Sequence, residues 1–156
     1  MARLMALDVG EARIGVAVSD SSRILASPYT TLRVSRDEAR IWSAIQHLIN
    51  ETETEGLVIG LPISLDGQIY EQGERVQAFA ERLKQHITIP VTFWDERLST
   101  VEAERLLAER EQQAQGKPIR RGGKRLKDGW KRRQHQGIDA MAAAVILQEY
   151  LDHAAQ

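Results

Sequence analysis

The chain has 156 residues, with 21 Lys and Arg residues against 22 Asp and Glu residues and a formal net charge of −1. This length favours a single domain over residues 1–156 with a sizeable hydrophobic core. Because the chain contains no cysteine, disulfides, thiolate zinc sites and cysteine nucleophiles are excluded. No apolar run approaches the roughly 20 residues of a membrane span, and no signal-peptide pattern precedes the first strand. We therefore expect a cytoplasmic protein with no membrane partner.

The balanced net charge conceals a strongly basic segment. Nine of the 21 basic residues and only one of the 22 acidic residues fall between positions 117 and 133, so this segment carries +8 and the rest of the chain −9. Glycines such as Gly122 and Gly123 predict a flexible loop over about 116–136, and Trp130 stands among the cations. A solvated loop is the plain interpretation. A mobile basic arm with one aromatic residue also suits a phosphate backbone and a stacked base.

Three strands are predicted in succession at the start of the chain. Apolar runs and alternation indicate strands at 4–9, 13–19 and 30–34, and the short connection at 10–12 indicates a hairpin between the first two. Strands and helices then alternate. Capping boxes begin helices at Ser35 and Ser99, and the other elements are a strand at 57–62, a helix at 70–86, a strand at 90–94 and a helix at 138–151. This order predicts an α/β fold with a mixed five-stranded sheet and helices on both faces.

Several carboxylates follow or interrupt the predicted strands. Asp8 lies inside the first apolar strand, where a carboxylate is costly unless it bonds the turn at Gly10, pairs with a cation or binds a metal. Asp95 and Glu96 end the last strand and point to opposite faces, so only one of them can share a site with Asp8. Alternation alone does not choose between them, and both could simply favour the helix start that follows. Arg97 is suited to hold a phosphate.

Asp139 stands at the start of the last predicted helix. It is therefore either a helix cap or the third member of a carboxylate cluster with Asp8. Asp20 and Asp66 follow a strand and begin a turn, and they are weaker candidates. Three carboxylates without cysteine suit Mg²⁺ or Mn²⁺, which prefer oxygen ligands.

Taken together, these motifs resemble the YqgF/RuvX family in order and spacing, over almost the whole chain. They are Leu7-Asp8-Val9-Gly10 with Arg13 to Asp20, Val58 to Pro62, Asp66-Gly67, Asp95 to Thr100, and Asp139 to Ala143. The resemblance implies an RNase H-like nuclease domain related to Holliday-junction resolvases. It also implies a hydrolase of phosphodiester bonds in ribosome biogenesis, acting in the 5′-end maturation of bacterial pre-16S rRNA.

By the same resemblance, Asp8, Glu96 and Asp139 look like the catalytic, metal-binding carboxylates, holding two Mg²⁺ or Mn²⁺ ions. Related resolvases carry an acid where this chain has Gly60, so the middle acid is Glu96 or, as the alternative, Asp95. The long connection before the last helix departs from the shorter one of many relatives, and it is either a flexible arm or an ordered lid. The residues expected to contact nucleic acid are Arg97, Arg120, Arg121, Lys124, Arg125, Lys127, Lys131, Arg132 and Arg133.

Other functions stay open from the sequence. A Holliday-junction resolvase would use the same acids on DNA, as a symmetric dimer, and the chain itself is a monomer or a homodimer. A non-catalytic nucleic-acid-binding module is disfavoured because all three candidate acids are present. A phosphotransferase of the actin and sugar-kinase type shares the Asp-x-Gly hairpin but needs two lobes, and 156 residues supply one. RNA is the expected partner over DNA, as pre-16S rRNA or a pre-ribosomal particle.

Overall fold

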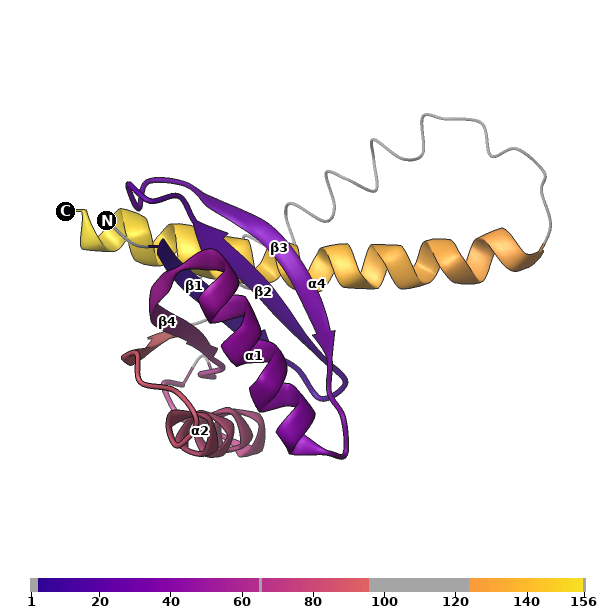
Figure 1. Ribbon diagram of the computed structural model, residues 1–156. Helices are drawn as coiled ribbons and strands as arrows, with labels where there is room; N and C mark the ends of the chain where they lie inside the picture. Colours follow the sequence, from indigo (N-terminus) through magenta and orange to yellow (C-terminus); the bar gives the residue numbers. More distant parts are fainter. Residues whose placement is uncertain (1–2, 65, 96–123, 156) are drawn as a thin grey trace.

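A mixed five-stranded sheet lies at the centre of the structure (Figure 1). The computed structural model describes residues 3–64, 66–95 and 124–155, with 124–136 as backbone only. The strands lie in the order β3-β2-β1-β4-β5, with β1 antiparallel to β2, β2 antiparallel to β3, and β4 parallel to both β1 and β5. Their bounds are β1 Arg3–Val9, β2 Arg13–Ser19, β3 Ala26–Arg33, β4 Thr54–Leu61 and β5 Val91–Asp95. The mixed sheet predicted from the sequence is confirmed.

Helices cover both faces of this sheet. Helices α1 (Glu38–Thr52) and α2 (Glu71–Lys84) lie against one face, and α4 (Lys124–Ala154) crosses the other (Figure 1). Alternation along each strand divides the buried side chains between the two layers. In β1, Met5 and Leu7 pack with α1 and α2, whereas Ala6 packs with α4.

The α4 layer is built largely from small side chains on both sides of the contact. The strands contribute Ala6 and Ala17, and the helix contributes Ala143 and Ala144. The helix also lies directly on Gly15, where a Cβ atom would be 1.9 Å from the carbonyl oxygen of Asp139. Small residues thus let the helix backbone approach the sheet backbone closely.

Polar side chains tie α4 to both edges of the sheet. The Gln148 side chain accepts a hydrogen bond from the Ala26 N–H at 2.9 Å and donates one to the Ile24 carbonyl oxygen at 2.9 Å. At the other edge, the Trp94 indole N–H donates to the Glu149 carboxylate at 3.3 Å. Ala26 belongs to β3 and Trp94 to β5, so adjacent helix residues bridge the full width of the sheet.

The last helix is longer than the sequence predicted. It begins at Lys124 rather than near Ile138, so residues 124–136, which were predicted to lie in a loop, are helical. Figure 1 shows this N-terminal part of α4 extending beyond the end of the sheet. The glycines of this segment had indicated a loop. A single glycine inside a helix, however, destabilises the helix by only about 1 kcal/mol, so the helix can continue through it. Residues 116–123 and the helix predicted from Ser99 lie outside the described residues.

Two other boundaries differ from the prediction. The N-cap of α1 is Asp37, whose carboxylate accepts from the Ala39 N–H at 3.1 Å, while the Ser35 hydroxyl accepts from the Asp37 N–H. Strand β3 begins at Ala26, four residues earlier than expected, and includes Pro28. Proline is tolerated there because β3 is an edge strand, where a missing N–H breaks no ladder on the outer side.

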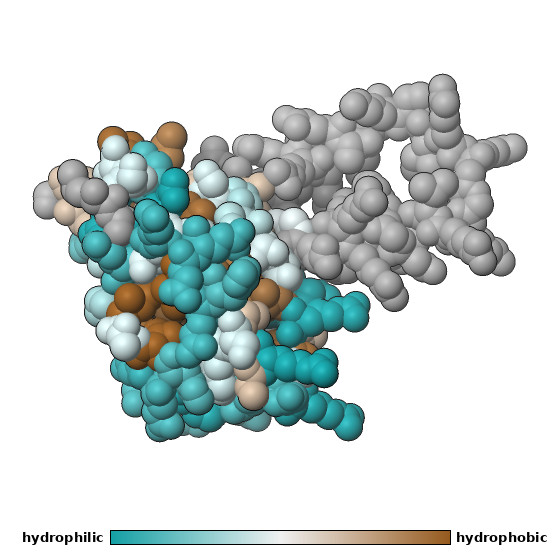
Figure 2. Space-filling model, in the orientation of Figure 1, coloured by the Kyte–Doolittle hydropathy of each residue, from teal (hydrophilic) through white to brown (hydrophobic). Residues whose placement is uncertain are grey.

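The face seen in Figure 2 is mostly hydrophilic, with small and separate hydrophobic patches. The large hydrophobic side chains that are exposed in the described part of the chain are Ile24, Leu25, Tyr29, Val34 and Tyr70. Scattered exposed apolar residues of this kind are usual on globular proteins. Within that same part of the chain, no helix combines the length and the hydropathy needed to cross a membrane.

Candidate active site

Asp8 lies near the end of β1, on the face of the sheet that α4 covers. Ala6, two residues earlier on the same strand, packs in the α4 layer, so alternation places Asp8 on that face. The residue is half-buried, and its partner across the antiparallel pair is Gly15 on β2. A carboxylate therefore stands where the strand leaves the core, beside the position on which α4 rests.

Asp139 lies fifteen residues inside α4 rather than at a helix start. A capping role, one of the two interpretations open from the sequence, is therefore wrong. The Asp139 carbonyl group lies over Gly15, with its oxygen 1.9 Å and its carbon 2.3 Å from an ideal Cβ at that glycine. Because Gly15 is paired with Asp8, the fold brings Asp8 and Asp139 together, although 131 positions separate them in the sequence.

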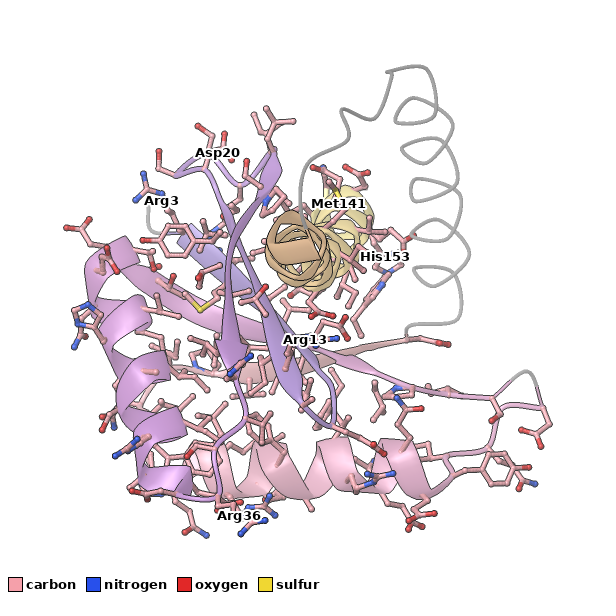
Figure 3. All side chains as sticks on the ribbon, turned by 90° about the vertical axis from the view of Figure 1, so that its right-hand side faces the viewer. Arg3, Arg13, Asp20, Arg36, Met141 and His153 are labelled. Atoms are coloured by element: carbon pink, nitrogen blue, oxygen red, sulfur yellow. The ribbon has the colours of Figure 1, made fainter. Side chains whose placement is uncertain are left out.

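Arg13 is a member of this site that the sequence interpretation missed. Its Nε donates to the Asp139 Oδ2 at 2.7 Å, and Figure 3 shows it on the sheet below α4, which is seen end-on. A signal was present: Ile14 and Val16 form one face of the strand, so alternation puts Arg13 on the other face with Gly15. The site thus contains two carboxylates and one guanidinium.

Asp95, one of the two candidates for the middle acid, ends β5. Phe93 packs with the α1 and α2 layer and Trp94 with the α4 layer, so alternation places Asp95 on the α1 and α2 face, in register with Leu61. Asp8 lies on the opposite face. Glu96, the other candidate for the middle acid, lies outside the described residues.

The predicted nucleic-acid contacts fall in two groups. Arg97, Arg120 and Arg121 lie outside the described residues. The remaining six belong by backbone to the N-terminal part of α4, on the same helix as Asp139, and they are Lys124, Arg125, Lys127, Lys131, Arg132 and Arg133.

The weaker candidates Asp20 and Asp66 build turns instead. Asp20 accepts from the Ile24 and Leu25 N–H groups at 2.8 and 3.1 Å, and these bonds lower the pKa of its carboxyl group. Asp66 accepts from the Tyr70 hydroxyl and the Gln68 N–H, and these bonds lower its pKa in the same way. Hydrogen bonds to the charged form explain both shifts.

The donor chemistry of the site fits a hard divalent cation. Asp8 and Asp139 offer carboxylate oxygens, which are the ligands that Mg²⁺ and Mn²⁺ prefer. Among the residues whose side chains the structure describes, no three His, Asp or Glu side chains gather into a cluster able to hold a metal. The described part therefore supplies two of the three carboxylates that the sequence motifs imply.

Solved structures share the arrangement of sheet and helices. Thermus thermophilus RuvC in complex with a Holliday junction substrate matches with a TM-score of 0.55 and 13% identity, over 99% of this chain and 96% of that chain. A second structure of Thermus thermophilus RuvC matches with a TM-score of 0.52 and 10% identity, over 98% and 96%. The chain thus has the RNase H-like fold, as the resemblance to the YqgF/RuvX family implied.

Sequence comparison narrows the class to one family. The signature of the family described as "RuvX: Holliday junction resolvase" matches residues 2–153. A relative from a Roseiflexus species is 44% identical over 151 residues, covering 96% of this chain and 94% of the relative. A relative from Thermoanaerobacter pseudethanolicus is 39% identical over 150 residues, covering 96% of each chain. Both carry the name "Putative pre-16S rRNA nuclease". The chain belongs to the RuvX family and is a nuclease, an enzyme that hydrolyses phosphodiester bonds.

Proposed function

We propose that this nuclease cleaves precursor RNA in the 5′-end maturation of pre-16S rRNA, with divalent cations held by Asp8, Glu96 and Asp139. The observation that carries the proposal is the seating of α4 on Gly15, which puts the Asp139 main chain beside Asp8. The names of the relatives support the RNA substrate. Ribosome assembly is a cytoplasmic process in bacteria, so this function implies a cytoplasmic enzyme.

Strand alternation favours Glu96 over Asp95 as the middle acid. Asp95 lies on the α1 and α2 face of β5, whereas Trp94 lies on the face of Asp8 and Asp139. Asp95 thus lies on the face opposite Asp8 and Asp139, which leaves Glu96 as the candidate for the middle acid. We therefore assign the role to Glu96.

Rigid elements of the fold hold the two described carboxylates of the proposed site in place. Asp8 is held by the strand ladder and Asp139 by a helix tied to both edges of the sheet, so the two carboxylates are presented from rigid elements. When bound there, Mg²⁺ or Mn²⁺ supplies Lewis-acid stabilisation of the phosphate oxygens and a water of lowered pKa, and two ions act together in two-metal nucleases. The partial burial of Asp139, whose side chain is 24% exposed, reduces screening by solvent.

The N-terminal part of α4 is suited to hold the substrate backbone. At about 1.5 Å of rise per residue, its six basic positions lie roughly 9 to 22 Å along the helix from Asp139. A nucleic acid whose scissile phosphate lies at Asp139 can therefore place its flanking phosphates along this segment. We propose that Arg97, Arg120 and Arg121 also contact nucleic acid, and that binding weakens steeply with salt.

Junction resolution is the second candidate function. The observation in its favour is the shared fold with a RuvC structure whose bound substrate is a Holliday junction. Cutting two strands symmetrically requires a homodimer, whereas processing one RNA end does not. The two functions therefore differ in substrate and oligomeric state rather than in the acids.

One cleavage assay tests both candidates. A pre-16S rRNA 5′ leader and a four-way DNA junction are incubated with the wild type, Asp139→Asn or Asp152→Asn, with Mg²⁺, with Mn²⁺ or with chelator. Asp152 is an exposed carboxylate on the same helix, so Asp152→Asn is the matched control. We expect metal-dependent cleavage of the RNA by the wild type and Asp152→Asn but not by Asp139→Asn. Cleavage of the junction alone would establish the second candidate, and an active Asp139→Asn enzyme would refute the site.

A further inference from the structure

Arg13 forms an ion pair with a carboxylate that we propose as a metal ligand. Its Nε donates to the Asp139 Oδ2 at 2.7 Å, a length typical of charge-assisted hydrogen bonds. Arg13 is the first residue of β2 and lies two residues before Gly15, on the same face of the strand. The guanidinium is thus anchored to the sheet directly below α4 (Figure 3).

This ion pair is more shielded from solvent than the others in the described part of the chain. The Asp139 side chain is 24% exposed, whereas the carboxylate residues of the other ion pairs are 46% to 73% exposed. Exposed pairs are screened and contribute little. The charge of Arg13 therefore acts on Asp139 at a higher effective strength than surface cations act on their partners.

The Arg13 guanidinium and a divalent cation compete for the same Asp139 carboxylate. An arginine beside the site also repels a second positive charge, so it opposes metal binding. If Asp139 binds a metal, the guanidinium loses this partner, and it then lies beside the site at which the proposed function puts the substrate phosphate. Arginine matches phosphate oxygens well in charge and geometry.

We propose, on the basis of the function proposed above, that Arg13 is a positioning residue with two alternating partners. It holds the Asp139 carboxylate in the enzyme free of metal, and it binds the substrate phosphate once divalent cations occupy that carboxylate. The ion pair therefore weakens metal binding in the absence of nucleic acid. Metal binding becomes stronger when substrate is bound, because the substrate phosphate then takes the place of Asp139 as the partner of Arg13.

The first test measures Mn²⁺ binding by isothermal titration calorimetry, without nucleic acid. Removing the competing positive charge in Arg13→Gln should tighten Mn²⁺ binding about ten-fold, from the repulsion between a monocation and a dication a few ångströms apart. Arg13→Met, which keeps the aliphatic stem, should show the same gain and serves if Arg13→Gln does not fold. Arg13→Lys keeps the charge and should stay within about two-fold of the wild type.

Arg75→Gln is the matched control. Arg75 on α2 pairs with Glu11 at the same 2.7 Å distance, away from Asp139, and both side chains are more than half exposed. This variant loses the same charge and should bind Mn²⁺ as the wild type does. Unchanged or weaker Mn²⁺ binding in Arg13→Gln would overturn the proposal, because a residue that only orients Asp139 would weaken binding when removed. By contrast, wild-type Mn²⁺ affinity in Asp139→Asn would overturn the proposed metal site itself.

The second test separates KM from kcat at saturating Mn²⁺. Loss of the phosphate contact in Arg13→Gln should raise KM for the RNA about ten-fold, with a smaller effect on kcat, because the lost bond is charge-assisted. Arg13→Lys should restore much of the affinity. An unchanged KM would refute the contact between Arg13 and the substrate phosphate.

Discussion

Gly15→Ala adds one methyl group at the point where α4 rests on the sheet. A Cβ at this position would lie 1.9 Å from the Asp139 carbonyl oxygen, 2.3 Å from its carbonyl carbon and 3.0 Å from the Ala140 nitrogen. Comfortable contacts between such atoms are about 3.5–4.0 Å, so α4 and β2 would have to move apart by roughly 1.5–2 Å. Main-chain atoms stand on both sides of this contact, so no side-chain rotation can relieve it.

The structure sets the expected size of the effect. Overpacking a well-packed core costs typically 1–3 kcal/mol, and an obstacle made of backbone puts Gly15→Ala near the upper limit, at about 3 kcal/mol. For a chain of this length, that loss lowers Tm by roughly 6–12 °C. The same movement carries Asp139 away from Asp8. Because a displacement of about 1 Å at a catalytic site can cost a hundred-fold in rate, cleavage should fall by about 100-fold or more.

Thermal unfolding and initial cleavage rates at saturating Mn²⁺ measure both effects. Gly137→Ala is the matched control, since Gly137 lies in α4 two residues before Asp139 and a Cβ there meets no atom within 4 Å. Replacing a glycine inside a helix by alanine should stabilise the protein by up to about 1 kcal/mol. If Gly15→Ala kept the wild-type Tm and rate, the close seating of α4 on β2 would be refuted, and with it the juxtaposition of Asp8 and Asp139.

Three further predictions concern charge. Asp139→Asn should abolish cleavage while RNA binding, followed by fluorescence anisotropy, stays within about two-fold, since the basic contacts remain; loss of binding as well would contradict this division of roles. Replacing Lys131, Arg132 and Arg133 together by Gln should weaken RNA binding and reduce the slope of log K against log salt by about 2, and an unchanged slope would exclude this part of α4 from the interface. Two N–H groups of the β2–β3 turn lower the pKa of Asp20, so its ionised form stabilises the fold above the ordinary Asp pKa, and this contribution is lost as the pH falls through the folded pKa. Wild type should therefore melt above Asp20→Asn at pH 7, and this difference in Tm should shrink as the pH falls through the folded pKa of Asp20; a difference in Tm that does not change with pH would contradict that origin.

The strands could be predicted because their signal is local. Met5 and Leu7 on one face and Ala6 on the other reflect a buried strand whatever surrounds it, and the hairpin at 10–12 needs only a short turn. The start of β3 could not be predicted, because Pro28 is compatible with a strand only at a sheet edge. Whether a strand lies at the edge depends on the order of the whole sheet.

The start of α4 was mispredicted for a related reason. Glycines argue for a loop when a segment is judged alone, yet the helix continues through Gly129 and Gly137. Each glycine costs about 1 kcal/mol, an amount that the rest of a 31-residue helix packed across a sheet can offset. That packing involves β1, β2 and β3, which precede α4 by about a hundred positions or more.

By itself, the sequence determined which acidic and basic residues are candidates for the chemistry. A carboxylate in an apolar strand, another beside an alanine-rich helix, and a +8 segment just before it are all visible in the residue order. Only the tertiary structure decided how they meet. It placed Asp139 within the helix on Gly15 rather than at a cap, turned Asp95 to the opposite face, and brought Arg13 onto the Asp139 carboxylate. The physical reason is that burial cost and charge belong to single residues, whereas proximity depends on the close packing of α4 against β2.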